Sequence, residues 1–260
     1  MEANDTNMPF IRNLASSDRK VRTAALESLR TFLSAAATAK RLTPLDNLKL
    51  WKGLYYSLWM CDRPVPQQNL CAELAALMDV LPDDAVRPWL DAFWEIIGRE
   101  WTSIDVLRLE KFMLLVRRVL GASIAWATAA PRGKGKAAKK KADARADALI
   151  DTLSIWPMDS EDDLSRVPVG LRLHVLDIWI DEAEKLGLLD AEKTGEAGWL
   201  FLERLKLVIE QTTKSTCKPV RLRAKETLTD DRLPWNRDLN NGSEGEAVKK
   251  DKDNWDGFED

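Results

Sequence analysis

The side chains best suited to catalysis are few and lie apart in the sequence. The single histidine, His174, has Asp177 one helical turn away, where a carboxylate can accept a hydrogen bond from the imidazole. A base oriented in this way needs a nucleophile or a metal ion as its third member, and no position in the sequence supplies one. We therefore interpret His174 as a structural or surface residue and the chain as non-enzymatic. An enzyme that uses His174 and nearby carboxylates is the alternative hypothesis.

Metal-ligand and phosphate-binding motifs are missing as well. Neither zinc-ligand spacing nor the density of a disulfide scaffold is present in the three cysteines, Cys61, Cys71 and Cys217. They are typical of small buried side chains in a reducing compartment. The GKGK stretch lacks the strand, the glycine spacing and the Ser or Thr of a P-loop. Adjacent carboxylates such as Asp83 and Asp84 more often cap helices or stay solvated than bind a cation. We expect neither a metal nor a cofactor.

The chemistry that remains is that of exposed cations. In the segment PRGKGKAAKKKADAR, which starts at Pro131, a proline and two glycines precede a Lys-rich run. Such a run can follow phosphates or act as a nuclear-import signal, and the alternative is a solvated linker without a specific partner. No aromatic residue is interleaved with the cations, so the segment offers no base stacking. We predict RNA contacts from Arg132, Lys134, Lys136, Lys139, Lys140 and Lys141.

A second basic feature lies on one expected helix. Arg108, Lys111 and Arg118 lie on roughly one side of it, whereas Leu107 and Met113 are expected to pack. A solvated face is the default interpretation of such a pattern. Contact with a phosphate backbone is the alternative, and we carry the three cations forward as candidate RNA-binding residues.

The composition limits the class of protein. In 260 residues, 39 basic and 42 acidic side chains give a formal net charge of −3, so any affinity for nucleic acid must come from local clusters. With 45% hydrophobic and 31% charged residues, the chain has the balance of a globular protein. No stretch approaches the roughly 18 uninterrupted apolar residues of a membrane span, and the N-terminus lacks the apolar region of a signal peptide. We expect no contact with membranes.

The apolar pattern of the sequence indicates that helices carry the candidate residues. Val21, Ala25 and Leu29 recur at helical spacing behind a Ser pair, and Thr43 followed by Pro44 is typical of a helix start. Strand-like alternation is nowhere sustained, and the connections are short. The sequence therefore predicts an all-α fold of antiparallel helix pairs with HEAT-like, α-solenoid packing.

A weak internal repeat supports this fold. The pattern V-R-x-x-A-x-x-x-L starts at Val21 and again at Val220. It resembles the second helix of HEAT-type repeats, in which Val, Ala and Leu pack inwards and Arg lies outside.

The composition also divides the chain. We expect an N-terminal helical region over 1–130, a flexible basic linker over 131–142, a second helical region over 143–230 that packs on the first, and a polar acidic tail over 231–260. The linker has almost no apolar side chain larger than Ala, so we expect it to be mobile and its deletion to leave thermal stability nearly unchanged.

Tryptophan is enriched, with 11 Trp against 2 Tyr. Trp51, Tyr55 and Trp59 recur at i, i+4 and i+8 and form one stripe on a helix. Together with Trp94 and Trp101, they suit either a core or a docking surface. We predict that most of them are buried within the chain, because such stripes are more often core.

Two long stretches resemble a known family. LWKGLYYSLWMCDRPVPQQNL, from Leu50 to Leu70, and FWEIIGREWTSIDVLRLEKFMLLVRRVL, from Phe93 to Leu120, are similar to the eukaryotic nucleolar ribosomal RNA-processing protein 1 family. The segments LASSDRKVRTAALESLRTFL and VPVGLRLHVLDIWIDE resemble it too, so the likeness covers about residues 8–182. Cys61 and Arg63 depart from it, standing where a small polar residue and Lys are expected.

The resemblance implies a nucleolar factor that is bound to precursors of the large (60S) ribosomal subunit and needed for maturation of its RNAs. It implies a protein that is not a nuclease and that acts with other assembly factors, including a WD-repeat protein and a Brix-domain protein. Two other hypotheses stay open, a general nuclear helical-repeat adaptor and an RNA-processing enzyme.

If the chain is a structural adaptor for other assembly factors, the Trp- and Pro-containing motifs make the partner contacts and should then be partly exposed. The candidate partner-binding residues are Trp59, Asp62, Arg63, Pro64 and Trp101.

Overall fold

The computed structural model describes residues 10–35, 39, 41–130, 133, 135–159, 161–190 and 194–237. These residues form helices and no β-strand, which confirms the all-α prediction. The order is α1 (Phe10–Leu14), α2 (Arg19–Ser34), α4 (Pro44–Trp59), α5 (Pro64–Ala75), the 3-10 helix η2 (Ala76–Val80), α6 (Asp83–Trp101), α7 (Val106–Thr128), α8 (Lys136–Ile155), α9 (Val169–Lys185), α10 (Glu196–Thr212) and α11 (Lys218–Leu228).

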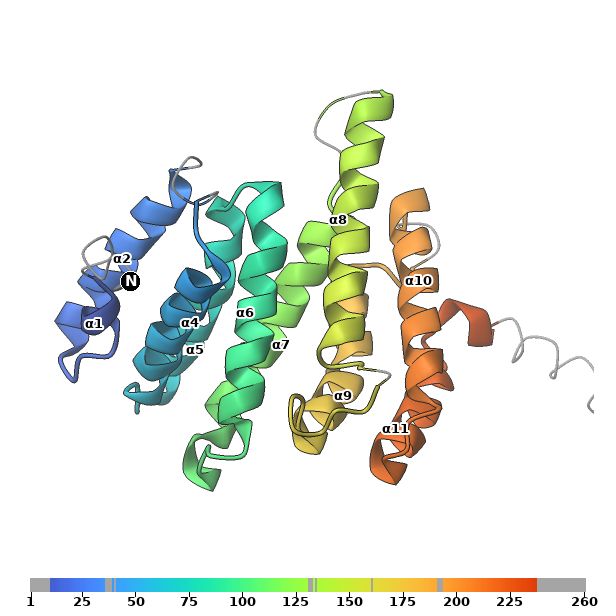
Figure 1. Cartoon of the computed structure of the whole chain (residues 1–260). Helices are drawn as coiled ribbons and strands as arrows, with labels where there is room; N and C mark the ends of the chain where they lie inside the picture. Colours follow the sequence, from blue (N-terminus) through green and yellow to red (C-terminus); the bar gives the residue numbers. More distant parts are fainter. Residues whose placement is uncertain are drawn as a thin grey trace, which may run out of the picture.

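The helices lie in two layers, and each layer takes every second helix of the chain. In one layer α4 packs on α6, α6 on α8 and α8 on α10, and in the other α5 packs on α7, α7 on α9 and α9 on α11. Figure 1 shows the pairs side by side along one axis, with the α4–α5 and α6–α7 turns on the same edge, the lower one in that view. This is the arrangement of an α-solenoid.

Local signals in the sequence set the helix starts. Thr43 caps α4 in a capping box with Asp46, and Pro44 occupies the first turn, where its missing N–H costs nothing. Asp105 caps α7, because its Oδ1 accepts hydrogen bonds from the backbone N–H groups of Leu107 and Arg108, both at 3.1 Å.

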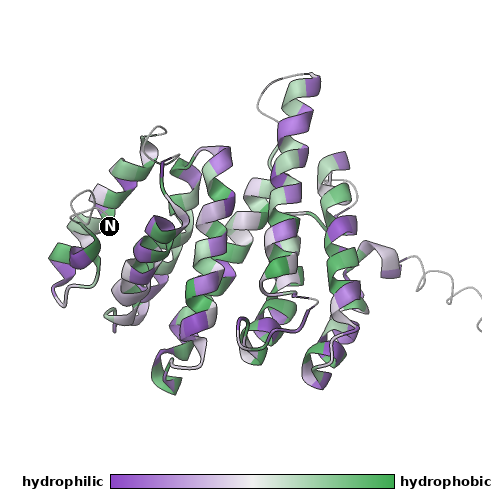
Figure 2. Cartoon of the chain, viewed as in Figure 1, coloured by the Kyte–Doolittle hydropathy of each residue, from purple (hydrophilic) through white to green (hydrophobic). Residues whose placement is uncertain are grey.

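Most of the aromatic stripe belongs to the core, as predicted, and only its Trp59 is half-buried. Trp51, Tyr55 and Trp94 are 2%, 3% and 1% exposed. The ring centres of Trp51 and Trp89 are 4.9 Å apart, and Trp51 Nε1 donates to the Trp89 carbonyl at 2.9 Å. Truncating such a ring to alanine costs about 3–5 kcal/mol, so Trp51 fixes how α4 sits on α6. Figure 2 shows apolar and polar residues alternating along each helix, as expected of helices that bury one face.

The two copies of the internal repeat have the same local structure, but their arginines bond to the backbone instead of extending into solvent. Arg22 is buried, and its Nη1 donates to the carbonyls of Ser16 and Ser17 at 2.8 and 2.9 Å. Arg221 repeats the arrangement with the carbonyls of Ser215 and Thr216, at 2.6 and 3.2 Å. Each arginine therefore closes the turn that precedes its own helix.

The two valines of the repeat also differ. Val220 is fully buried, whereas Val21 is 37% exposed, so the expectation that both pack inwards is wrong for Val21. Ala25 and Ala224 are both buried, as expected.

The expected flexible linker over 131–142 is wrong in its second part. Residues 136–142 form the first turns of α8, because Lys and Ala favour helix and Ala142 packs, at 4% exposed. Arg132 and Lys134 lie outside the described residues. The tail also starts later than expected, since Leu233 is fully buried and Trp235 packs against the core. Residues 238–260 lie outside the description.

None of the helices that the structure describes has the length and apolar character needed to cross a membrane.

Candidate partner and RNA interfaces

Lys111, predicted to contact RNA, is a buried structural residue. Its side chain is 3% exposed, and its Nζ donates to the carbonyls of Trp59 and Cys61 at 2.8 and 2.9 Å. Burial lowers the pKa of Lys111, and the nearest carboxylate, that of Asp62, lies 3.9 Å away on a largely exposed side chain. Lys111 therefore clamps α7 to the end of α4 and is not available to phosphates.

Arg108 and Trp59 form one unit beside this clamp. The Arg108 guanidinium lies 4.8 Å from the centre of the Trp59 ring, and its Nη1 donates to Asp105 Oδ2 at 2.5 Å. The hydrogen bond from Arg108 lowers the pKa of Asp105, which therefore stays ionised. Trp59 is half-buried, because Tyr55 and Phe112 cover its other side.

Exposed apolar side chains surround this unit. Val106 and Leu107 at the start of α7 are 81% and 89% exposed, and Val65 at the start of α5 is 66% exposed. Leu107 was expected to pack, but α7 buries the face with Phe112 and Leu115 and turns its first residues outwards. Arg63, next to Val65, is also exposed.

The Lys111 clamp holds these two turns close together, so they form one surface. We call it the turn edge, and it consists of Trp59, Asp62, Arg63, Pro64, Val65, Val106, Leu107 and Arg108. Four of the predicted partner-binding residues belong to it. The sequence did not lead us to expect Val65, Val106 and Leu107 on this surface. The only signal for them was that apolar residues directly follow the start of a helix.

Trp101, the fifth predicted partner-binding residue, is core and not surface. It is 8% exposed, and its ring lies parallel to the His174 ring with 6.4 Å between centres. A partner cannot reach it without opening the α6–α9 contact.

His174 is a buried side chain that bonds to the backbone. Its Nε2 lies 2.9 Å from the Met113 carbonyl oxygen, and since that oxygen only accepts, Nε2 carries the proton. Burial lowers the pKa of His174. The Asp177 carboxylate accepts instead from Arg223 of α11. Within the described ranges, no three His, Cys, Asp or Glu side chains gather closely enough to hold a metal ion.

The cations of α8 lie on the opposite edge of the molecule from the turn edge. Figure 1 shows the first turns of α8 standing out beyond the neighbouring helices. Lys136, Lys139, Lys140 and Lys141 are exposed there, and Lys139 forms an ion pair with Glu196 at 3.2 Å. Arg118 is exposed on α7, but with Lys111 buried and Arg108 held by Asp105 the three predicted cations of α7 do not form a common basic face.

Asp162 is a residue whose role the sequence did not indicate. It adopts a left-handed backbone (φ 57°) in the loop between α8 and α9. Its carboxylate accepts from Arg172 Nη1 at 2.6 Å, Ser215 Oγ at 2.6 Å and the Thr216 backbone N–H at 2.5 Å. Burial alone would raise the pKa of Asp162, but these hydrogen bonds outweigh it and lower the pKa to about 2. Asp162 thus ties this loop to the α10–α11 turn.

The stacked pairs and their exposed edges define a helical-repeat protein, a class that binds its partners along extended surfaces. Residues 5–260 match the family described as "Nucleolar protein, Nop52". The chain belongs to this family. The match reaches well beyond residue 182, where the resemblance seen in the sequence loosens, and the family's nucleolar description agrees with the expected localisation.

Individual relatives agree with the family. The chain is 31% identical over 207 residues to ribosomal RNA processing protein 1 homolog A of Mus musculus, a match that covers 78% of this chain and 39% of that protein. It is 31% identical over 183 residues to homolog B of Homo sapiens, covering 68% and 22%. A homolog from Dictyostelium discoideum is 24% identical over 189 residues, covering 69% and 37%. The chain thus spans less than half the length of these relatives.

Proposed function

We propose that the chain is a non-catalytic factor in ribosome biogenesis that acts in assembly of the large (60S) subunit and in maturation of its precursor rRNA. It works as a scaffold that binds other assembly factors through the turn edge and touches pre-rRNA through the cations of α8. The names of its relatives, ribosomal RNA processing protein 1 homologs, support the process. The partners of WD-repeat and Brix-domain type follow from the resemblance of the sequence.

The observation that carries the scaffold proposal is the composition of the turn edge. Large apolar side chains that stay in water cost free energy, so a cluster of three of them at the meeting point of two turns is typical of a docking surface. Trp and Arg, the residues most enriched in binding hot spots, stand beside them as the Trp59–Arg108 unit. Arg63 adds a charge at the rim, where it favours an acidic partner.

The state of His174 supports a non-catalytic role. The one imidazole of the chain is buried and donates to a backbone carbonyl, and its neighbour Asp177 is engaged by Arg223. No substrate reaches a base held in this way without a rearrangement of α7 and α9.

The turn edge can be tested with two matched double variants. Val65→Ser with Leu107→Ser removes apolar side chains from the turn edge. Leu207→Ser with Leu222→Ser removes leucines that are 58% and 53% exposed on α10 and α11. Both variants should fold, because exposed substitutions change stability by about 0.5 kcal/mol or less.

We expect the turn-edge variant to lose at least tenfold in co-sedimentation with large-subunit precursors, since burying a Val or Leu side chain on binding contributes about 1.5–3 kcal/mol. The control variant should sediment as the unaltered chain does. Equal retention of both variants would refute the turn edge as the docking surface. Co-purification with nuclear proteins but without ribosomal precursors would favour the general nuclear adaptor instead.

A further inference from the structure

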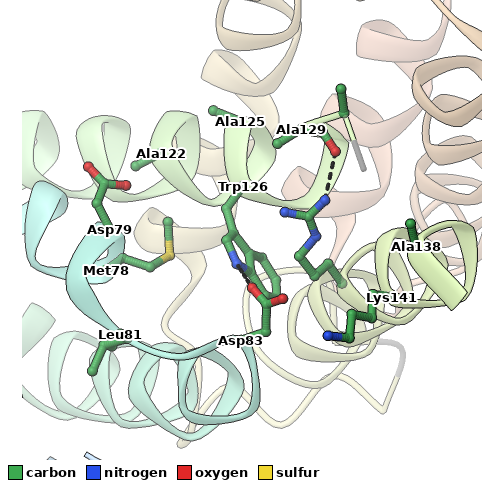
Figure 3. A pocket seen from close by; sticks show the side chains of 12 residues that line it. Met78, Asp79, Leu81, Asp83, Ala122, Ala125, Trp126, Ala129, Ala138 and Lys141 are labelled. Carbon is green, nitrogen blue, oxygen red and sulfur yellow. Dashed lines mark hydrogen bonds between the residues drawn. The ribbon is translucent and has the colours of Figure 1, made fainter. Parts of the chain in front are cut away.

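A groove opens on the edge opposite the turn edge, where the end of α7 meets the starts of α6 and α8. Its volume is about 660 Å³. Binding pockets for small ligands range over about 300–1,000 Å³, so one nucleotide fits. Figure 3 shows its walls: η2 and the start of α6 on one side, α8 on the other, and the last turns of α7 between them.

Trp126 of α7 stands in the middle of this groove. Its Nε1 donates to Asp83 Oδ1 at 3.2 Å, which fixes the orientation of the ring. The residues around it on α7 are small, namely Ala122, Ala125 and Ala129. Figure 3 shows the ring directed into the open space between the walls. A planar base can therefore reach the indole face, and such stacking is the main means by which proteins hold unpaired bases.

The two walls carry opposite charges. Lys141 and Arg145 lie on the α8 wall. Arg145 donates to the Ala129 carbonyl at 2.7 Å, and in the described part of the chain neither cation forms an ion pair with a carboxylate. Asp79 and Asp83 lie on the opposite wall. A phosphate is therefore attracted to α8 and repelled by η2 and α6, so a bound nucleotide has only one favourable orientation.

The carboxylates select the base. They only accept hydrogen bonds, so they favour a base edge that donates. Guanine presents an imino N–H and an amino group side by side, whereas each other base offers one such group on that edge. Asp83 uses its Oδ1 to accept from Trp126, and among the described residues its Oδ2 remains available to accept from a base. Asp79 is exposed.

We propose that this groove binds one unpaired guanine nucleotide of RNA. The base stacks on Trp126, the adjacent imino and amino groups of its Watson–Crick edge donate to the Asp83 carboxylate, and its phosphate lies against Lys141 and Arg145. The proposal rests on the proposed contact with pre-rRNA and names the nucleotide and the site. No aromatic residue is interleaved with the basic run in the sequence, but the fold brings Trp126 of α7 to Lys141 and Arg145.

The first test is a photochemical cross-link to the unaltered full chain. An oligouridine eight nucleotides long, with one 6-thioguanosine, is irradiated with the protein, and the tryptic peptides are sequenced. Trypsin releases VLGASIAWATAAPR (residues 119–132), in which Trp126 is the only aromatic residue. We expect the cross-link in this peptide. A cross-link confined to other peptides would overturn the guanine site.

The second test measures affinity by fluorescence anisotropy. One guanine in labelled oligouridine should raise the affinity about fivefold or more over oligouridine alone. Trp126→Leu should abolish this preference and lower the affinity about tenfold, as expected for one lost stacking contact. Trp126→Phe, which keeps a ring, should retain part of it. Asp83→Asn, which keeps the acceptor for Trp126 Nε1, should reduce the preference for guanine, whereas Glu73→Gln, a change at an exposed acid on α5, should not.

These outcomes separate the two proposals. If the chain binds RNA without preference for guanine and Trp126→Leu has no effect, the groove is not the site but the RNA contact stands. If the chain binds none of the oligonucleotides, the RNA contact of the proposed function fails together with the groove. A groove that holds a protein segment instead would give no cross-link in residues 119–132.

Discussion

Single side chains link parts of this molecule that lie far apart in the sequence. Asp162 is the clearest case, since one carboxylate from the α8–α9 loop receives hydrogen bonds from Arg172, Ser215 and Thr216. A neighbouring pair of acids in the same loop, Glu161 and Asp163, looks equivalent in the sequence. Only the position of the α10–α11 turn distinguishes Asp162 from them.

Asp162 should make stability depend on pH at the acid end. Its folded-state pKa of about 2 lies below the unfolded value of about 3.9. The stabilisation is therefore fully present above pH 4 and is lost as the pH falls from about 4 to 2. A shift of this size corresponds to at most about 2.6 kcal/mol.

The matched variant is Asp162→Asn, since Asn also tolerates the left-handed backbone. Urea unfolding should show the variant about 2 kcal/mol less stable at pH 6, with the difference shrinking as the pH falls to 2. A difference that stays constant over this range would mean that the charge of Asp162 does not hold the loop.

At the scale of the elements, the contact between the α4–α5 turn and α7 decides which residues become surface. α4 ends at Trp59, whose carbonyl accepts from Lys111, and the Cys61 carbonyl in the turn that follows accepts from both Lys111 and Gln67. The clamp holds the α4–α5 turn against α7, and the exposed Val65, Val106 and Leu107 stand at the starts of α5 and α7 on this edge.

We expect Lys111→Met to destabilise the protein by about 2 kcal/mol, because the Trp59 carbonyl loses its donor and the Cys61 carbonyl keeps only Gln67, while the apolar part of the side chain is kept. Arg118→Met is the control, since Arg118 is exposed on the same helix and its loss should cost under about 0.5 kcal/mol. The free energy of unfolding in urea measures both. Equal effects would show that Lys111 contributes no more than a solvated cation.

For the whole molecule, the two surfaces that we propose for binding lie on opposite edges, so they could be occupied together. With a net charge of −3, the protein has no overall field that attracts RNA. The four exposed lysines of α8 can contribute a log–log salt slope of at most about −2.8, at roughly −0.7 per phosphate of single-stranded RNA. Contacts this sensitive to salt suit a secondary role.

Replacing Lys136, Lys139, Lys140 and Lys141 by Gln, with an independent nuclear-import signal added, should therefore leave the chain on large-subunit precursors, bound less tightly. Sedimentation of nuclear extracts measures this, and circular dichroism checks that α8 stays helical. Complete loss from the particles by a folded, nuclear variant would make the RNA contact primary and the protein contacts secondary.

The fold class could be predicted from the sequence, because helix periodicity and caps are local properties. Thr43, Pro44 and the stripe from Trp51 to Trp59 identify α4 without any knowledge of its neighbours. The family resemblance could also be recognised in the sequence, since it depends on residue order alone. The burial of most of the aromatic stripe followed from its spacing.

Which polar residues are exposed to partners depends on how the helices pack, and the sequence did not show it. Lys111 and Arg118 look alike on a helical wheel, yet one side chain meets the buried end of α4 and the other meets water. Trp126 of α7 lies in one groove with Lys141 and Arg145 of α8. Trp101 of α6 is buried against His174 of α9. Both arrangements depend on contacts between helices that are distant in the sequence. The cause is the same in each case. A periodic pattern shows which face of a helix packs, but the free energy of a polar or aromatic side chain depends on the groups that other helices place beside it.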